Sequence, residues 1–169
     1  MPILILIGLA IILSDGFPVF FKQKRIGLNN SYFHLYKFRT MRKNTPDIPT
    51  HRLDNPEKYL IRFGNFLRKY SLDEIPQLIN IIKSEMSFIG PRPALHNQDD
   101  LIDIRTKHNI HLLYPGITGW AQVNGRDELT IEEKVLYDKF YFENRSLILN
   151  IKILFKTFSK VLFKIGVKH

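Results

Sequence analysis

The sequence predicts an α+β fold: a mainly helical single domain with a β-hairpin, an apolar N-terminal helix and an amphipathic C-terminal helix. Its 169 residues fit one domain of ordinary size. Two alternating apolar runs flank a short turn rich in glycine and asparagine, which is typical of a hairpin. Most of the remaining chain carries apolar residues at helical spacing. Because 44% of the residues are hydrophobic, the chain can form a core.

The N-terminal segment, residues 1–13, carries no charge. As a helix it would be roughly 20 Å long, which is shorter than the ~20-residue helix that spans a bilayer. It also lacks the basic start and the small-residue cleavage site of a signal peptide. It is therefore either a buried core helix or a membrane-associated helix that dips into one leaflet.

The elements that follow are predicted from periodicity and from turn residues. The hairpin strands are expected over residues 19–26 and 32–38, with the turn at 27–30. Helices are expected over 56–70, 71–83, 94–108 and 130–143. Thr130, with Glu133 three residues later, predicts a capping box for the last of them. Loops are expected over 42–55 and 114–126, with a rigid, proline-bounded loop at 90–93.

The C-terminal tail, residues 147–168, predicts a basic amphipathic helix. Four lysines recur every four residues, at positions 152, 156, 160 and 164, beside a broad apolar face that includes Ile151, Phe155 and Phe158. Such a helix lies at a membrane surface, or it packs on the core with its lysines in solvent. The uncharged segment at the other end of the chain favours the membrane.

Composition limits the chemistry. The absence of cysteine excludes disulfides, thiol nucleophiles and thiolate zinc sites. The net charge of +9 favours anionic partners: nucleic acid, lipid headgroups or phosphorylated substrates. The chain carries neither a Walker A motif nor a dinucleotide-binding glycine motif. His108 and His111 are three residues apart without a carboxylate triad nearby, so a metal site there is not expected.

The strongest chemical signal is the adjacent pair Asp73 and Glu74. Either Ser71 caps a helix together with Glu74, or Asp73 is the cap and Pro76 lies in the first turn. In both cases the free N–H groups and the helix dipole are expected to hold the two carboxylates ionised. An ionised carboxylate can attack phosphorus or hold Mg²⁺, although such residues also act simply as helix caps.

Cations surround this pair in the sequence. Arg68 and Lys69 precede it, and Arg92 follows between two prolines, where little entropy is lost on binding phosphate. Lys37, Arg39 and Arg42 supply further positive charge. Carboxylates beside a basic cluster suit a magnesium-bound pyrophosphate substrate.

Five segments resemble the bacterial sugar transferases, which are monotopic phosphoglycosyl transferases. They are GFPVFFKQ (16–23), YKFRTM (36–41), LRKYSLDE (67–74), MSFIGPRP (86–93) and PGITGWAQVNGR (115–126), in the order found in the family. The resemblance implies transfer of a sugar phosphate from a UDP-sugar to polyprenyl (undecaprenyl) phosphate, with release of UMP. It places the enzyme on the cytoplasmic face of the bacterial inner membrane, with no nucleic-acid partner.

The resemblance also implies residue roles. Asp73 would be the nucleophile, forming a phosphosugar-aspartyl intermediate, and Glu74 would hold Mg²⁺ with it or act as base. Substrate phosphates would be bound by Arg92, Lys37, Arg39 and Arg68. The nucleotide or sugar would be bound by Gln122, Asn124 and Arg126.

Two positions depart from the family pattern. Met1-Pro2 falls where the family carries the Ser-Pro break of a re-entrant helix, so residues 1–15 are expected to be a remnant of that helix, with weaker anchoring. The catalytic domain would then span 16–146, and the interfacial helix 147–169. Asn150 stands where the family often carries aspartate.

Two other hypotheses follow from the sequence. A truncated chain could be inactive and bind only membrane or a partner. The charge and the aromatic-basic run of residues 32–42 could instead belong to a nucleic-acid-binding module, although no nucleic-acid motif supports this. Neither the sugar nor the glycan pathway can be predicted.

Overall fold

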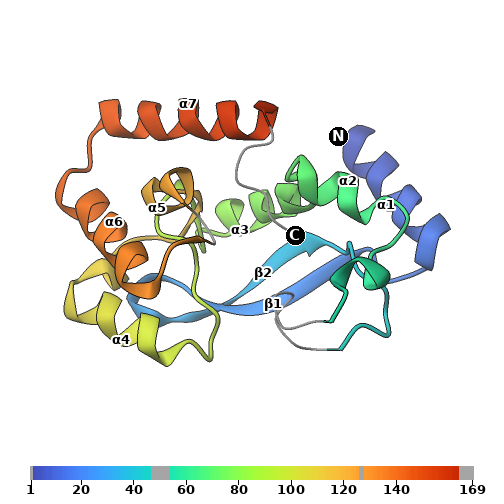
Figure 1. Ribbon diagram of the computed structural model, residues 1–169, viewed down its shortest axis with the longest axis horizontal. Coiled ribbons are helices and arrows are strands. Elements are labelled where there is room, and N and C mark those ends of the chain that lie inside the picture. Colours follow the sequence, from blue (N-terminus) through green and yellow to red (C-terminus); the bar gives the residue numbers. More distant parts are fainter. Residues whose placement is uncertain (1, 47–53, 126–127, 164–169) are drawn as a thin grey trace. The chain divides into compact units, whose positions relative to one another are not determined.

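The computed structural model describes residues 2–46, 54–125 and 128–163 (Figure 1). The chain packs as two compact units. The first takes its described residues from 2–22 and 36–76, and the second from 23–35 and 77–163. Helices and strands occur together along the chain, so the mixed α+β class is confirmed. The predicted boundaries at residues 15 and 146 stay a prediction.

The hairpin forms where the sequence predicts it. Strands β1 (Phe20–Ile26) and β2 (Tyr32–Phe38) pair around the short 3₁₀ turn η1 (Leu28–Asn30). Asn29 and Asn30 have positive φ angles of 53° and 57°, which asparagine tolerates better than most residues. Phe33 and Leu35 alternate into the core of the second unit, as period-2 patterning requires.

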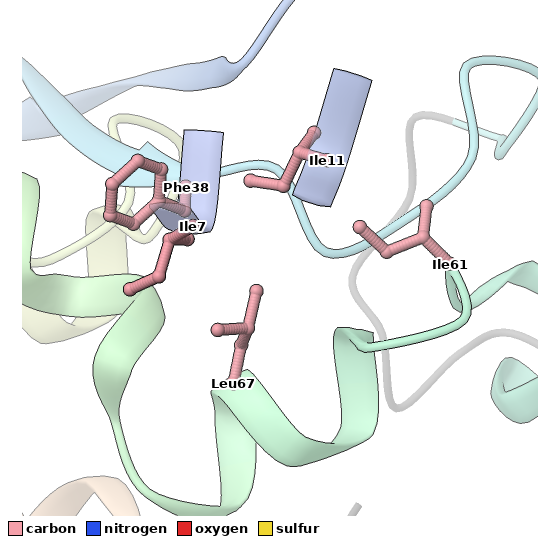
Figure 2. Packing of buried hydrophobic residues seen from close by; sticks show 5 residues of the cluster. All are labelled: Ile7, Ile11, Phe38, Ile61 and Leu67. Carbon is pink, nitrogen blue, oxygen red and sulfur yellow. The ribbon is translucent and has the colours of Figure 1, made fainter. Parts of the chain in front are cut away.

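The first unit is built around helix α1 (Pro2–Asp15). Ile7 and Ile11 pack against Phe38, Ile61 and Leu67, as Figure 2 shows. Other α1 side chains remain exposed, and Leu13 keeps 87% of its surface. One face of α1 thus packs in the core of the first unit and another is apolar surface, while the expectation that the segment dips into one leaflet stays a prediction. None of the helices in the described ranges is long and apolar enough to cross a membrane.

The prediction of one continuous helix over residues 56–70 is wrong, because the chain is not helical in the middle of this range. The chain forms a 3₁₀ turn, η3 (Pro56–Tyr59), and then a separate helix, α2 (Gly64–Lys69). Between them Leu60 pairs with Met41, and the Ile61 N–H donates to the Thr40 carbonyl oxygen at 3.0 Å. These backbone groups are therefore unavailable to a helix. Leu67 of α2 is buried, whereas Phe63 and Phe66 are about half exposed.

The next predicted helix, 71–83, forms as two consecutive segments. They are the 3₁₀ helix η4 (Leu72–Gln77) and the helix α3 (Leu78–Ile82).

The second unit contains a parallel strand pair that the sequence did not reveal. β3 (Ser87–Ile89) pairs with β4 (Gly116–Thr118), with Ser87 opposite Gly116. The expected loop over 114–126 therefore contains β4 and the helix α5 (Trp120–Asn124). Around them lie α4 (Asp99–Lys107), η5 (Ile110–Leu112), α6 (Ile131–Glu143) and α7 (Leu147–Phe163).

Helix α4 begins later than predicted, whereas α6 has the predicted N-terminal cap. α4 begins five residues later than predicted, because Leu95 pairs with Arg25 and the Leu95 N–H donates to the Gln98 side chain. α6 has the predicted capping box: the Thr130 hydroxyl accepts from the Glu133 N–H, and the Glu133 carboxylate accepts from the Thr130 N–H at 2.8 Å.

The Asn150 side chain accepts a hydrogen bond from the buried Tyr141 hydroxyl at 3.0 Å.

The C-terminal helix is present as α7, and two of its lysines lie beside Trp120. The Nζ atoms of Lys152 and Lys156 lie 5.5 and 4.9 Å from the Trp120 ring centroid, so both lysines pack over the indole. Lys164 lies outside the described residues. Several apolar side chains of α7 are exposed: Phe155 and Phe158 keep 74% and 68% of their surface. Ile153 of the same helix is buried in the core of the second unit, so part of the helix packs on the core, and a membrane contact of its exposed face stays a prediction.

Candidate active site

Asp73 and Glu74 lie in the first turn of η4. Ser71 precedes this turn with a φ of 54°, and its carbonyl oxygen accepts from the Glu74 N–H at 3.2 Å. The adjacent apolar side chains of Leu72 and Ile75 pack against the core of the first unit. The 3₁₀ helix therefore begins at Leu72 and holds Asp73 inside its first turn rather than at its cap.

Both carboxylates are buried, and cations accompany them within the first unit. Each keeps only 8% of its surface exposed. The Nζ of Lys37 lies 2.8 Å from the Oε1 of Glu74, so strand β2 supplies a counter-charge. The charges of Lys37 and Arg68 also act on Asp73. The Nε of Arg68 donates to the Thr40 hydroxyl at 2.9 Å, which fixes its guanidinium.

Burial raises the pKa of the Asp73 carboxyl above its ordinary range, and the neighbouring Glu74 adds to the rise, while Lys37 and Arg68 oppose it. Desolvation opposes the ionised form of Asp73 that the helix end was expected to hold, while Lys37 and Arg68 favour it, so that expectation stays a prediction. A carboxylate with a raised pKa is also a stronger nucleophile once it is ionised.

Arg39 is fully engaged by its surroundings. Its guanidinium pairs with the Asp15 carboxylate and donates to the carbonyl oxygens of Pro18 (2.6 Å) and Gly16. Further bonds reach the carbonyls of Met41 and Asp15. These contacts tie the end of α1 to the end of β2. A phosphate contact from Arg39, which stays a prediction, would require one of them to break.

Arg92 stands on the rigid loop that the prolines predict, in the second unit. Its carbonyl oxygen accepts from the Nη1 of Arg105 at 2.9 Å, and the Pro93 carbonyl accepts from Arg25 at 2.9 Å. At the start of the loop, a Cβ at Gly90 would lie 2.2 Å from the Tyr114 carbonyl oxygen, so only glycine fits. The Arg92 side chain is half-buried.

The predicted nucleotide- or sugar-binding residues also lie in the second unit. Gln122 Nε2 donates to the Ile117 carbonyl at 2.8 Å, while its buried Oε1 has no hydrogen-bond partner among the described residues. Asn124 is engaged at both ends, by the Trp120 carbonyl and by Lys156 Nζ at 2.9 Å. Arg126 lies outside the described residues. Gln122 thus keeps an acceptor for a ligand, whereas Asn124 would have to exchange partners.

The oxygen donors of Asp73 and Glu74 suit Mg²⁺, which takes one or two carboxylates together with substrate phosphates. The burial of the pair favours a cation, because a nearby positive charge would relieve the desolvation and mutual repulsion that raise the pKa of Asp73. Among the described residues no group of three or more His, Asp or Glu side chains could hold a metal by itself. A metal here would therefore need substrate oxygens.

Sequence reasoning missed the residues that position the candidate side chains within each unit. Thr40 holds Arg68. The buried pair Arg105 and Asp138 supports the Arg92 loop. Thr40 lies inside the YKFRTM motif, which is the only hint of its importance. Arg105 and Asp138 are 33 positions apart, so no local pattern links them.

The family model described as bacterial sugar transferase matches residues 1–164. The chain is 43% identical to the uncharacterized sugar transferase EpsL of Bacillus subtilis, covering 99% of this chain and 82% of the relative. It is 40% identical to the UDP-glucose:undecaprenyl-phosphate glucose-1-phosphate transferase of Xanthomonas campestris. It is 34% identical to the UDP-N-acetylgalactosamine-undecaprenyl-phosphate N-acetylgalactosaminephosphotransferase of Aeromonas hydrophila.

The last two matches cover 95% and 99% of this chain, but only 35% and 41% of the relatives. The family match extends over nearly the whole chain and includes the Asp73-Glu74 turn, the Arg92 loop and the segment with Gln122. The chain therefore belongs to the bacterial sugar transferase family, and it is an enzyme of the sugar phosphotransferase kind.

Proposed function

We propose that this chain transfers a sugar phosphate from a UDP-sugar to undecaprenyl phosphate, giving a polyprenyl diphosphosugar and UMP. The observation that carries the proposal is the buried Asp73, held in the first turn of η4 beside Glu74 and within the charge field of Lys37 and Arg68. The curated relatives named for undecaprenyl-phosphate chemistry support the same donor and acceptor classes.

In the first step, a carboxylate oxygen of Asp73 attacks the phosphorus next to the sugar. The bond from that phosphorus to the bridging oxygen breaks, and UMP leaves with the electron pair. Lys37 and Arg68 offset the charge that develops on the phosphoryl oxygens. In the second step, an oxygen of polyprenyl phosphate attacks the same phosphorus and releases Asp73 as a carboxylate.

Asp73 and Glu74 would hold Mg²⁺, which would neutralise phosphate charge when bound. Glu74 would also orient Lys37 through their 2.8 Å ion pair. Arg92, on its rigid loop, would bind phosphate. The buried Oε1 of Gln122 would accept a hydrogen bond from the nucleotide or the sugar.

The enzyme would act at the cytoplasmic face of the bacterial inner membrane, where its lipid acceptor resides. The exposed apolar faces of α1 and α7 support this, because large exposed apolar patches mark membrane or partner surfaces. The donor stays open. The relatives' names mention glucose and N-acetylgalactosamine, and N-acetylated hexosamines, bacillosamine-type sugars and galactose belong in the same test panel.

UMP release tests the proposal, measured in detergent with Mg²⁺, undecaprenyl phosphate and each UDP-sugar. Asp73→Asn should lower the rate about 10³-fold or more, because the nucleophile is lost. Asp103→Asn makes the same chemical change at an exposed position of α4 and should leave the rate unchanged. Intact-mass measurement with donor alone should show one added phosphosugar on the wild type and none on Asp73→Asn. Near-normal turnover by Asp73→Asn would remove Asp73 as nucleophile.

A further inference from the structure

A polar pocket lies in the first unit, at the C-terminal end of α1. It measures about 590 Å³ and is lined by Leu13, Ser14, Asp15, Arg42, Leu60, Ile61 and Arg62. None of these residues has a part in the proposed transfer reaction. The pocket is large enough for a phosphate headgroup, and two of its lining side chains are arginines.

The charge of this pocket is positive despite Asp15. The Asp15 carboxylate is paired with the Arg39 guanidinium, and the pKa of Asp15 is lowered by this hydrogen bond. Its negative charge is therefore already compensated. Arg42 and Arg62 have exposed side chains and no acidic partner in the described part of the chain. Arginine forks suit phosphate oxygens.

The backbone of both arginines is tied to the pocket frame. The Arg42 N–H donates to the Tyr59 carbonyl oxygen at 2.7 Å. The Arg62 N–H donates to the Ser14 hydroxyl oxygen at 3.2 Å. Because Ser14 accepts that bond, its own hydroxyl proton remains able to donate toward a bound oxygen. Arg42, Arg62 and Ser14 thus line the same pocket.

Apolar surface adjoins these cations. Leu13 lines the pocket and is 87% exposed, and Phe17, just beyond the end of α1, is 68% exposed. Leu60 also lines the pocket and is half-buried. A free phosphate would satisfy the arginines alone, whereas a phosphate attached to acyl chains satisfies both kinds of surface.

We infer that this pocket binds the phosphate headgroup of an anionic membrane phospholipid, separately from the donor and acceptor of the transfer reaction. Binding there would fix the C-terminal end of α1 at the headgroup level of the membrane. Through the Arg39–Asp15 pair, the same contact would act on the end of β2, two residues from Lys37.

Vesicle flotation tests this without any UDP-sugar. The probes are vesicles of phosphatidylcholine alone, and of phosphatidylcholine and phosphatidylglycerol in equal parts. The double variant Arg42→Gln/Arg62→Gln should lose at least about tenfold in affinity for the anionic vesicles. Its affinity for phosphatidylcholine should not change. The charge-matched control Lys58→Gln/Lys107→Gln, at exposed positions outside the pocket, should lose much less.

Equal losses in the two double variants would overturn the site, since they would indicate diffuse surface charge. Soluble glycerol phosphate at the concentration of lipid phosphate should not displace the protein, and displacement would assign the pocket to a free phosphate instead. For this comparison, both double variants must keep the unfolding midpoint of the wild type. If the double glutamine variant does not fold, the single variants replace it, each with an expected loss of about fivefold.

Discussion

At the residue scale, the carboxyl group of Asp73 combines reactivity with a stability cost. Burial is the main reason that its pKa is raised in the folded chain. A raised carboxyl pKa favours the folded state at low pH, and that contribution is lost as the pH rises through the folded-state pKa. Burial of this carboxyl therefore costs stability as the pH rises towards neutrality, as groups in active sites often do.

Asp73→Asn should therefore be more stable than the wild type at pH 7 to 8, with the difference vanishing near pH 4, about the pKa of an unfolded aspartate. Urea unfolding across this pH range measures it. Glu74→Gln is the contrasting variant: it removes the partner of Lys37 and should not be stabilised. A destabilised Asp73→Asn variant at neutral pH would mean that its attraction to Lys37 and Arg68 exceeds its desolvation.

The buried pair of Arg105 and Asp138 gives a second residue-scale prediction. Asp138 is 1% exposed and accepts bonds from the Nε and Nη2 of Arg105. Asp138→Asn would leave the guanidinium charge buried without its counter-ion and should cost about 3–5 kcal/mol of unfolding free energy. Arg105→Met/Asp138→Leu should recover part of that loss, because it removes both charges. Denaturant unfolding measures the free energy of unfolding of the wild type, the single variant and the double variant. If the double variant recovers no stability, the loss comes from packing rather than from the unpaired charge.

At the element scale, helix α6 offers a clean test of a local signal. The Thr130 and Glu133 capping box was readable from the sequence and is present. Thr130→Ala should cost about 0.5–2 kcal/mol, because the Glu133 N–H loses its acceptor. Thr130→Ser keeps the hydroxyl and should cost much less. An equal loss in both variants, measured by urea unfolding, would assign the effect to the threonine methyl group rather than to the cap.

Elements could be predicted where their signal is local. The hairpin, α6 and α7 each carry periodicity or turn chemistry within their own residues. β3 and β4 could not be predicted, because each has three residues and gains its hydrogen bonds from a strand distant in sequence. The break between η3 and α2 has the same cause, since Leu60 pairs with Met41.

Some properties of the active-site residues could likewise be predicted from local sequence, and others could not. Asp73 and Glu74 were recognisable from adjacency, placement at a helix start and the family resemblance. The direction of the Asp73 pKa shift was not, because it depends on burial that packing alone decides. The clamp of Arg39 on Asp15 joins residues 24 positions apart, so the sequence suggested only a free cation.

At the scale of the whole molecule, helix α7 exposes apolar side chains on its outer face. In α7 the lysines at 152 and 156 pack over Trp120, while Phe155 and Phe158 face outward. A helix in water would gain from the opposite orientation, since exposed phenylalanine forfeits transfer free energy. The outward aromatic face therefore favours an apolar surrounding over solvent.

Phe155→Ser/Phe158→Ser should weaken binding to neutral phosphatidylcholine vesicles. Burying one phenylalanine contributes ~1.5–3 kcal/mol, so losing two should lower the partition coefficient by at least about tenfold. Leu112→Ser/Leu136→Ser removes two exposed apolar side chains from η5 and α6 and serves as the matched control. Because phosphatidylcholine carries no net charge, its vesicles measure the loss of apolar burial without any contribution from headgroup charge. Equal binding by both variants would show that α7 is not the membrane-facing element, and α1 would then carry the attachment.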